Sequence, residues 1–218
     1  MKKMSILLCI SAFLISCTEN RKEPRPFTPL QEPVPGTILV KEDTIIDACY
    51  TFEEAIAGTK APPDIIHQLE LFDVIYLSTD GKIHRGQILS NRKIAADLRQ
   101  LFAYMLRKGF VIDKAVPIVK YNWNDSLSMD DNNSYSFCYR NISYSKHATG
   151  MAIDINPRFN PVQWKKTNRP NQPEGAVLDT TVNGTLYPGH SVVKEFRKNG
   201  FRWGYAFSKY WDYHHFEK

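Results

Sequence analysis

A histidine and an aspartate seven positions apart are the residues whose types and spacing best suit chemistry. His147 and Asp154 lie in residues 145–156, where Gly150 separates the histidine from an apolar, β-branched run. Beyond this glycine the apolar residues alternate with small or polar ones, which is the period of a strand. The alternation places Asp154 on the polar face, and Gly150 permits a bend that brings His147 over that face. The pair is therefore a candidate set of metal ligands.

A third ligand is available near the C-terminal end of the printed sequence. Asp212 precedes His214 by two positions and His215 by three, among aromatic residues. Three protein ligands, an open position for water and a base beside it are what a hydrolytic zinc site requires. Two histidines and one carboxylate also suit non-haem iron, but the export signal described next and the lack of any oxygenase feature favour zinc. The other histidines, interpreted as structural, are His67, His84 and His190.

Residues 1–16 are predicted to be a lipoprotein signal peptide. Lys2 and Lys3 provide the positive start, and residues 6–15 form an apolar core too short to span a bilayer. The run Leu-Ile-Ser-Cys that ends at Cys17 resembles the bacterial lipobox, whose cysteine is lipid-modified and becomes the mature N-terminus. The alternative is an ordinary cleaved signal peptide with an incidental cysteine. We expect an extracytoplasmic chain, anchored by lipid to a bacterial membrane at its periplasmic or surface face.

Composition limits the remaining possibilities. The formal net charge is +5, or +3 without the two lysines of the signal, and this mild charge argues against a nucleic-acid partner. Residues 17–40 are charged and rich in proline, which is typical of an extended tether. Residues 41–218 are long enough for one catalytic domain. Cys49 and Cys138 either pair in an oxidising compartment or remain free thiols.

The pattern of apolar residues predicts alternating short helices and strands. The predicted helices are 51–57, 64–70, 92–108 and 191–199, and the predicted strands are 71–77, 83–89, 116–121 and 151–156, the first two joined as a hairpin. Residues 122–134 are predicted to be a polar loop near the active site, because the spacing of their carboxylates does not match an EF-hand. Residues 157–188 are predicted to be an irregular insertion that walls a substrate groove.

Two motifs resemble those of a known enzyme family. Residues 145–154 read Ser-x-His-x-x-Gly-x-Ala-x-Asp, and residues 212–216 read Asp-x-x-His-Phe. This combination resembles the M15 family of zinc D-alanyl-D-alanine carboxypeptidases and L-alanyl-D-glutamate endopeptidases, which includes VanY-type and VanX-type peptidases and several phage endolysins. The similarity runs from about residue 86 onward. It implies a small α+β fold, hedgehog/DD-peptidase-like, in which helices flank a small antiparallel sheet that carries the metal ligands.

The resemblance also implies roles for individual residues. The zinc ligands would be His147, Asp154 and His215. Asp212 would be the general base and Arg140 the cation that stabilises the oxyanion, with Arg85 as the alternative for this second role. Ser145 would position the substrate. His214 is expected on the opposite face from His215, near solvent or substrate.

The expected function is therefore that of a monomeric zinc peptidase acting on peptidoglycan stem peptides. The bond cut is either a terminal D-Ala-D-Ala or L-Ala-D-Glu, and Lys165, Lys166 and Arg169 are candidate cations for a free terminal carboxylate. The alternative is a non-catalytic, zinc-containing lipoprotein that binds the cell wall.

Overall fold

A computed structural model of the chain describes residues 43–142 and 144–218. The predicted signal peptide, the tether and the lipid-modified Cys17 lie outside the described residues. All of the described residues belong to one compact unit by their contacts. Among them, no helix combines the length and the apolar character needed to cross a membrane.

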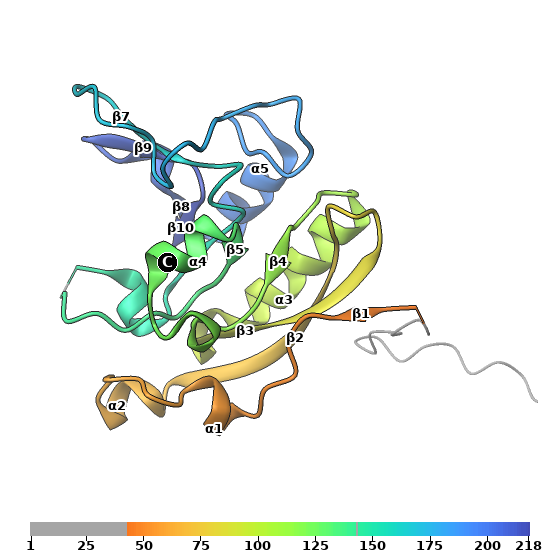
Figure 1. The fold of residues 1–218 in the computed structure, drawn as a ribbon, viewed down its shortest axis with the longest axis vertical. Helices are drawn as coiled ribbons and strands as arrows, with labels where there is room; N and C mark the ends of the chain where they lie inside the picture. Colours follow the sequence, from red (N-terminus) through yellow and green to blue (C-terminus); the bar gives the residue numbers. More distant parts are fainter. Residues whose placement is uncertain (1–42, 143) are drawn as a thin grey trace, which may run out of the picture. The chain divides into compact units, whose positions relative to one another are not determined.

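The longest strands form the predicted hairpin. β2 (Leu69–Leu77) pairs in antiparallel register with β3 (Ile83–Asn91), and the short β1 (Ile45–Ile46) pairs in parallel with β3. The predicted helix 92–108 is α3 (Arg92–Arg107), which begins where Asn91 accepts a hydrogen bond from the backbone N–H of Lys93. One apolar face of α3 packs on the hairpin (Figure 1).

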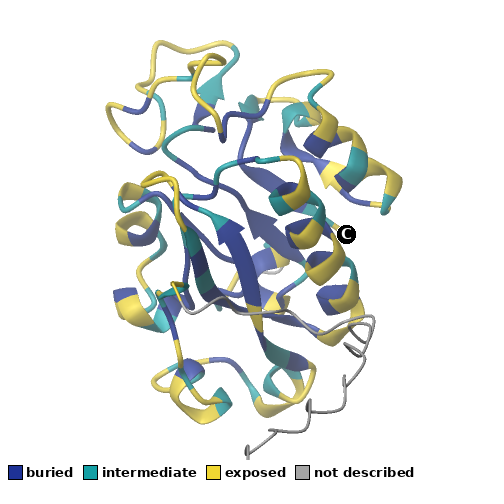
Figure 2. Cartoon of the chain, turned by 90° about the vertical axis from the view of Figure 1, so that its right-hand side faces the viewer, coloured by how far each residue is buried: buried dark blue, intermediate teal, exposed yellow. Residues whose placement is uncertain are grey.

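A second, smaller sheet carries the chemistry predicted from sequence. Its strands lie in the order β6 (Ala152–Asp154), β10 (His215–Glu217) and β8 (Arg202–Trp203), all antiparallel. α5 (Ser191–Lys198) covers one face of this sheet, where Phe196 stacks on Phe216 with ring centroids 4.0 Å apart. In Figure 2 the central strands are largely buried, whereas the helices expose their outer faces.

Short elements connect and flank the two sheets. Two two-stranded ribbons pair β4 (Lys114–Ala115) with β5 (Asn133–Ser134) and β7 (Val162–Trp164) with β9 (Tyr210–Asp212). The short α-helices are α1 (Phe52–Ala55), α2 (Pro63–Ile66) and α4 (Asp125–Asp130), and the 3₁₀ helices are η1 (Ile118–Tyr121), η2 (Lys146–Thr149) and η3 (Gly204–Ala206). This mixture of helices and small sheets confirms the α+β class.

Two predicted elements are wrong. Residues 116–121 do not form a strand: Pro117 offers no N–H to a sheet ladder, and the chain after it turns into η1. Residues 122–134 are not all loop, because Asn124 accepts a hydrogen bond from the Leu127 N–H and so caps α4. The predicted helix 64–70 is also too long, since Leu69 already begins β2.

One apolar core joins the hairpin, α3, the second sheet and α5. Ile153 and Ile155 lie in this core, as their alternation with Asp154 predicts. The two cysteines among the described residues, Cys49 and Cys138, do not pair with each other: Cys138 is a buried free thiol and Cys49 an exposed one.

Candidate metal centre

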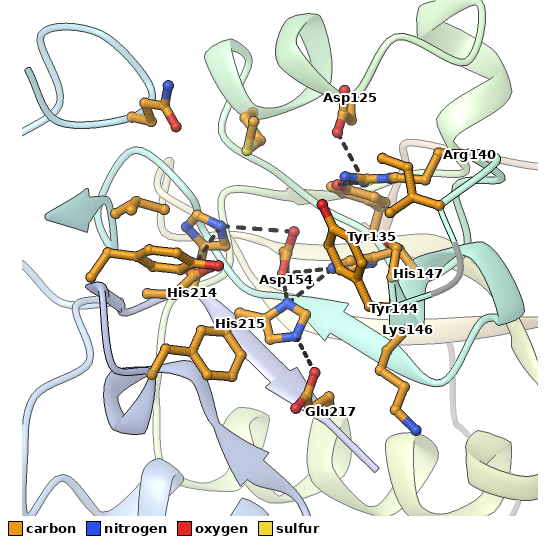
Figure 3. Close-up of a pocket in the computed structure, with 18 of the residues that line it drawn as sticks. Asp125, Tyr135, Arg140, Tyr144, Lys146, His147, Asp154, His214, His215 and Glu217 are labelled. Carbon is orange, nitrogen blue, oxygen red and sulfur yellow. Dashed lines mark hydrogen bonds and ion pairs between the residues drawn. The ribbon is translucent and has the colours of Figure 1, made fainter. Parts of the chain in front are cut away.

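Three side chains predicted as ligands converge on one point. His147 Nε2 lies 3.1 Å from Asp154 Oδ1, His215 Nδ1 lies 3.0 Å from the same oxygen, and the two nitrogens are 3.0 Å apart. All three side chains are buried, and among the described residues they form the group able to hold a metal ion (Figure 3).

Sheet register and one turn place these ligands. His215 lies opposite Asp154 in the pairing of β10 with β6. His147 lies in η2, which ends at Gly150 in a left-handed conformation with φ 68°. The Gly150 carbonyl accepts hydrogen bonds from the Asn91 N–H at 3.0 Å and from Ser90 Oγ at 3.1 Å. The turn predicted at this glycine is therefore confirmed, and it is fastened to the end of β3.

The spacing of the donors fits a small, tetrahedrally coordinated cation. Metal–ligand bonds of about 2.0–2.1 Å separate neighbouring tetrahedral ligands by about 3.3 Å. The observed separations of 3.0 to 3.1 Å are a few tenths of an ångström shorter. Two imidazole nitrogens and one carboxylate oxygen form a donor set that first-row divalent metals accept.

The second nitrogen of each histidine has its own partner. His147 Nδ1 lies 2.6 Å from the carbonyl oxygen of Ser136, and His215 Nε2 lies 3.2 Å from Glu217 Oε2. Both partners accept hydrogen bonds, so with a metal ion at the centre His147 would carry its proton on Nδ1 and His215 on Nε2. This assignment leaves the lone pairs of the other two nitrogens facing Asp154, which is the arrangement typical of metal-binding histidines.

The electrostatics of the cluster favour a cation at its centre. Burial opposes charge on Asp154, but the charges of His147 and His214 and hydrogen bonds from His147 and His215 hold its pKa well below the usual value. Burial also disfavours a charged His215, but hydrogen bonds to Asp154 and Glu217 outweigh it and raise the pKa of His215 to about 10. The protein groups thus stabilise positive charge between the three donor atoms.

Asp212, the expected general base, lies beside this cluster in the same cavity. Its Oδ1 is 3.1 Å from His214 Nε2, but the contact lacks hydrogen-bond geometry, so this buried oxygen makes no hydrogen bond among the described residues. His214 is itself buried, donates from Nδ1 to the Asn160 carbonyl at 2.7 Å and lies 3.8 Å from Asp154 Oδ2. His214 is thus buried beside the two acids and lines the cavity, so it is away from solvent but near the place expected for substrate.

Of the two arginines considered from sequence, Arg140 lines the cavity and Arg85 does not. Arg140 Nη2 lies 2.9 Å from Asp125 Oδ2 and 3.4 Å from the Tyr135 hydroxyl, whose ring stacks on His147. Arg85 faces Asp73 on the hairpin at 3.5 Å. Sequence reasoning missed Asp125 and Tyr135, because neither residue belongs to the motifs from which the site was predicted.

The cavity around these groups has a volume of about 350 Å³. Ser145 and Lys146 line it, but Lys165, Lys166 and Arg169 are not among its lining residues. Residues of the 157–188 insertion do form part of its wall, as predicted. The aromatic side chains that line it are Tyr135, Tyr144, Trp164, Phe207 and Tyr210.

Comparison with known proteins agrees with this geometry. A family model described as D-alanyl-D-alanine carboxypeptidase matches residues 140–218. The matched segment contains all three candidate ligands, Asp212 and Arg140. No significant match was found among curated proteins or among solved structures. Residues 140–218, which hold the whole candidate centre, are therefore similar to the M15 family of peptidases.

Proposed function

We propose that the protein is a zinc-dependent peptidase that hydrolyses peptidoglycan stem peptides. The observation that carries this proposal is the buried group of His147, Asp154 and His215 inside a cavity, within the segment that matches the carboxypeptidase family model. The substrate would be either a terminal D-Ala-D-Ala, cut by a carboxypeptidase, or L-Ala-D-Glu, cut by an endopeptidase.

Zinc held by these three side chains would supply Lewis acidity and a water of lowered pKa. Asp212 would accept the proton of the attacking water and return it to the leaving amine. Its buried Oδ1 makes no hydrogen bond among the described residues, so it remains available as an acceptor. Asp212 would thus act as the base, whereas Asp154 would act as a zinc ligand.

Arg140 would face the oxyanion that develops on the scissile carbonyl. Its ion pair with Asp125 and its contact with Tyr135 fix the guanidinium before substrate arrives. A positive group fixed in advance lowers the barrier because it needs no reorganisation during the reaction. Ser145, on the cavity wall, would position the substrate.

We also propose that the protein acts outside the cytoplasm as a monomer, held to a bacterial membrane by lipid on Cys17. The apolar run and the lipobox-like sequence support this proposal. Incorporation of labelled fatty acid into the wild type, and its loss in Cys17→Ser, would test the anchor.

Digestion of purified muropeptides, with products read by mass spectrometry, tests the activity. The zinc-loaded protein should release either a terminal D-alanine or a product cut after L-alanine, chelator should stop this release, and added zinc should restore it. Asp212→Ala should be inactive, whereas Asp64→Ala, at an exposed position on α2, should behave as wild type. A wild type without any zinc-dependent product would contradict the proposal and favour the non-catalytic wall-binding lipoprotein.

A further inference from the structure

We propose that Glu217 is a positioning residue of the metal centre, which holds the His215 ring with Nδ1 aimed at the ion, and that Arg202 holds Glu217 in turn. The proposal rests on the metal-binding part of the proposed function. Neither Glu217 nor Arg202 belongs to the motifs from which the site was predicted.

The first support is a chain of two contacts. His215 Nε2 lies 3.2 Å from Glu217 Oε2, and the other carboxylate oxygen, Glu217 Oε1, lies 3.4 Å from Arg202 Nη1. One carboxylate therefore contacts the ligand ring with one oxygen and the guanidinium with the other (Figure 3 shows the contact with His215).

The second support is the register of the small sheet. His215 and Glu217 are two positions apart on β10, so their side chains leave the same face of the strand. Glu217 lies opposite Arg202 on β8, and His215 lies opposite Asp154 on β6. Backbone pairing alone thus aligns the guanidinium, the carboxylate, the imidazole and the second ligand.

The chemistry of imidazole explains how this alignment would favour metal binding by His215. A ring that donates from Nε2 to a carboxylate keeps its proton there, so Nδ1 retains the lone pair that a metal needs. The carboxylate also limits rotation of the ring and makes Nδ1 more basic. His147 obtains its orientation from the Ser136 carbonyl instead, a neutral acceptor. Glu217 is therefore the one negatively charged acceptor that contacts a ligand histidine on the side away from the donor atoms, among the described residues.

A purely structural ion pair would not explain the arrangement. The Arg202 side chain is 59% exposed, and ion pairs at such positions contribute little to stability. The Glu217 side chain is only 17% exposed, because its other face is turned to His215. Loss of the carboxylate should therefore weaken metal binding far more than it destabilises the metal-free fold.

Zinc affinity, measured by competition with a chromophoric chelator, tests the proposal. Glu217→Ala should bind zinc about 10- to 100-fold more weakly than wild type. Glu217→Gln keeps an oxygen that accepts from Nε2–H, so it should recover part of this loss. Arg202→Ala should show a smaller loss than Glu217→Ala. Glu195→Ala, which removes an ion pair with Lys198 on α5, is the matched control and should bind as wild type.

A second readout separates positioning from folding. With chelator present, urea unfolding of Glu217→Ala should match that of wild type, and with Co²⁺ in place of zinc its visible spectrum should differ from that of wild type. Equal zinc affinities for Glu217→Ala and wild type would overturn the inference and leave the proposed peptidase intact. If Glu217→Ala binds zinc more weakly than wild type but the wild type cuts no muropeptide, the positioning role of Glu217 would be supported and the proposed peptidase activity would be overturned. A wild type that binds no metal would overturn both.

Discussion

His215 lies directly opposite Asp154 in the antiparallel pairing of β10 with β6. Two ligands separated by sixty-one positions along the chain are therefore held together by backbone hydrogen bonds. A shift of one residue in this register would turn His215 to the apolar face, where Phe216 packs on Phe196. The core of the small sheet thus enforces the geometry of the metal centre.

Removal of the metal should destabilise the protein. An ion that binds only the folded chain adds about 4 kcal/mol when its concentration is 1,000 times the dissociation constant. We expect chelator to lower the thermal midpoint of wild type and to leave that of Asp154→Ala, which lacks a ligand, unchanged. Scanning calorimetry with and without zinc measures both, and equal midpoints for wild type in the two conditions would contradict the ligand assignment.

Asp212→Asn should separate catalysis from metal binding. The amide keeps the size of the side chain but accepts no proton, so kcat should fall about 10²- to 10⁴-fold. Zinc affinity should stay within a factor of two, because Asp212 is not one of the three grouped ligands. Steady-state hydrolysis and chelator competition provide the two measurements. A large loss of zinc affinity would instead make Asp212 a ligand.

Gly204→Ala should damage the site through backbone contact. A Cβ at this position would lie 2.7 Å from Asp212 Cβ, 2.8 Å from the Asp212 carbonyl oxygen and 3.1 Å from His215 Cβ. Since backbone must move to admit the methyl group, we expect a loss of about 1–3 kcal/mol in unfolding free energy. Peptidase activity should fall as well, because the base and a ligand are displaced together. If Gly204→Ala were as stable and as active as wild type, the backbone would be shown to admit the added methyl group without displacing Asp212 or His215.

Much of the local structure could be predicted because its signals are local. Thr51 and Asn91 cap the helices that follow them, and the hairpin and α3 follow their apolar periods. The strand expected at residues 116–121 does not form, because its apolar residues pack from a 3₁₀ turn instead. Pattern alone does not distinguish these two uses of a short apolar run.

Part of the candidate site could likewise be predicted from local sequence signals, and part could not. His147 and Asp154 are close in sequence and share one turn, so their convergence could be inferred. Asp125 reaches the site through a tertiary contact with Arg140, whereas Tyr135 and Glu217 are close in sequence to their partners but lie outside the motifs. The one signal that could have found Glu217 is its spacing of two from His215 on a strand.

Arg140→Lys should lower kcat despite keeping the charge. Lysine lacks the rigid, planar guanidinium whose Nη2 contacts both Asp125 and Tyr135, so the cation would be held less firmly. Removal of an oxyanion donor costs about 10²- to 10³-fold in kcat, and we expect Arg140→Ala to reach this range, with Arg140→Lys in between. Arg85→Lys is the matched control. A larger loss in Arg85→Lys than in Arg140→Lys would reverse the assignment of the two arginines.

The stability of the metal-free protein should fall as pH rises above neutrality. The pKa of His215 is raised from 6.5 to about 10, chiefly because hydrogen bonds to Asp154 and Glu217 outweigh burial. A histidine whose pKa is higher in the folded state contributes stability that is complete below pH 6.5 and is lost as pH rises toward 10. Zinc competes with this proton, so zinc binding strengthens over the same pH range.

Urea unfolding at pH 6.5 and pH 9 should therefore give a stability difference between zinc-loaded and metal-free protein that widens with pH. Parallel pH profiles for zinc-loaded and metal-free wild type would show that His215 does not exchange its proton for the ion.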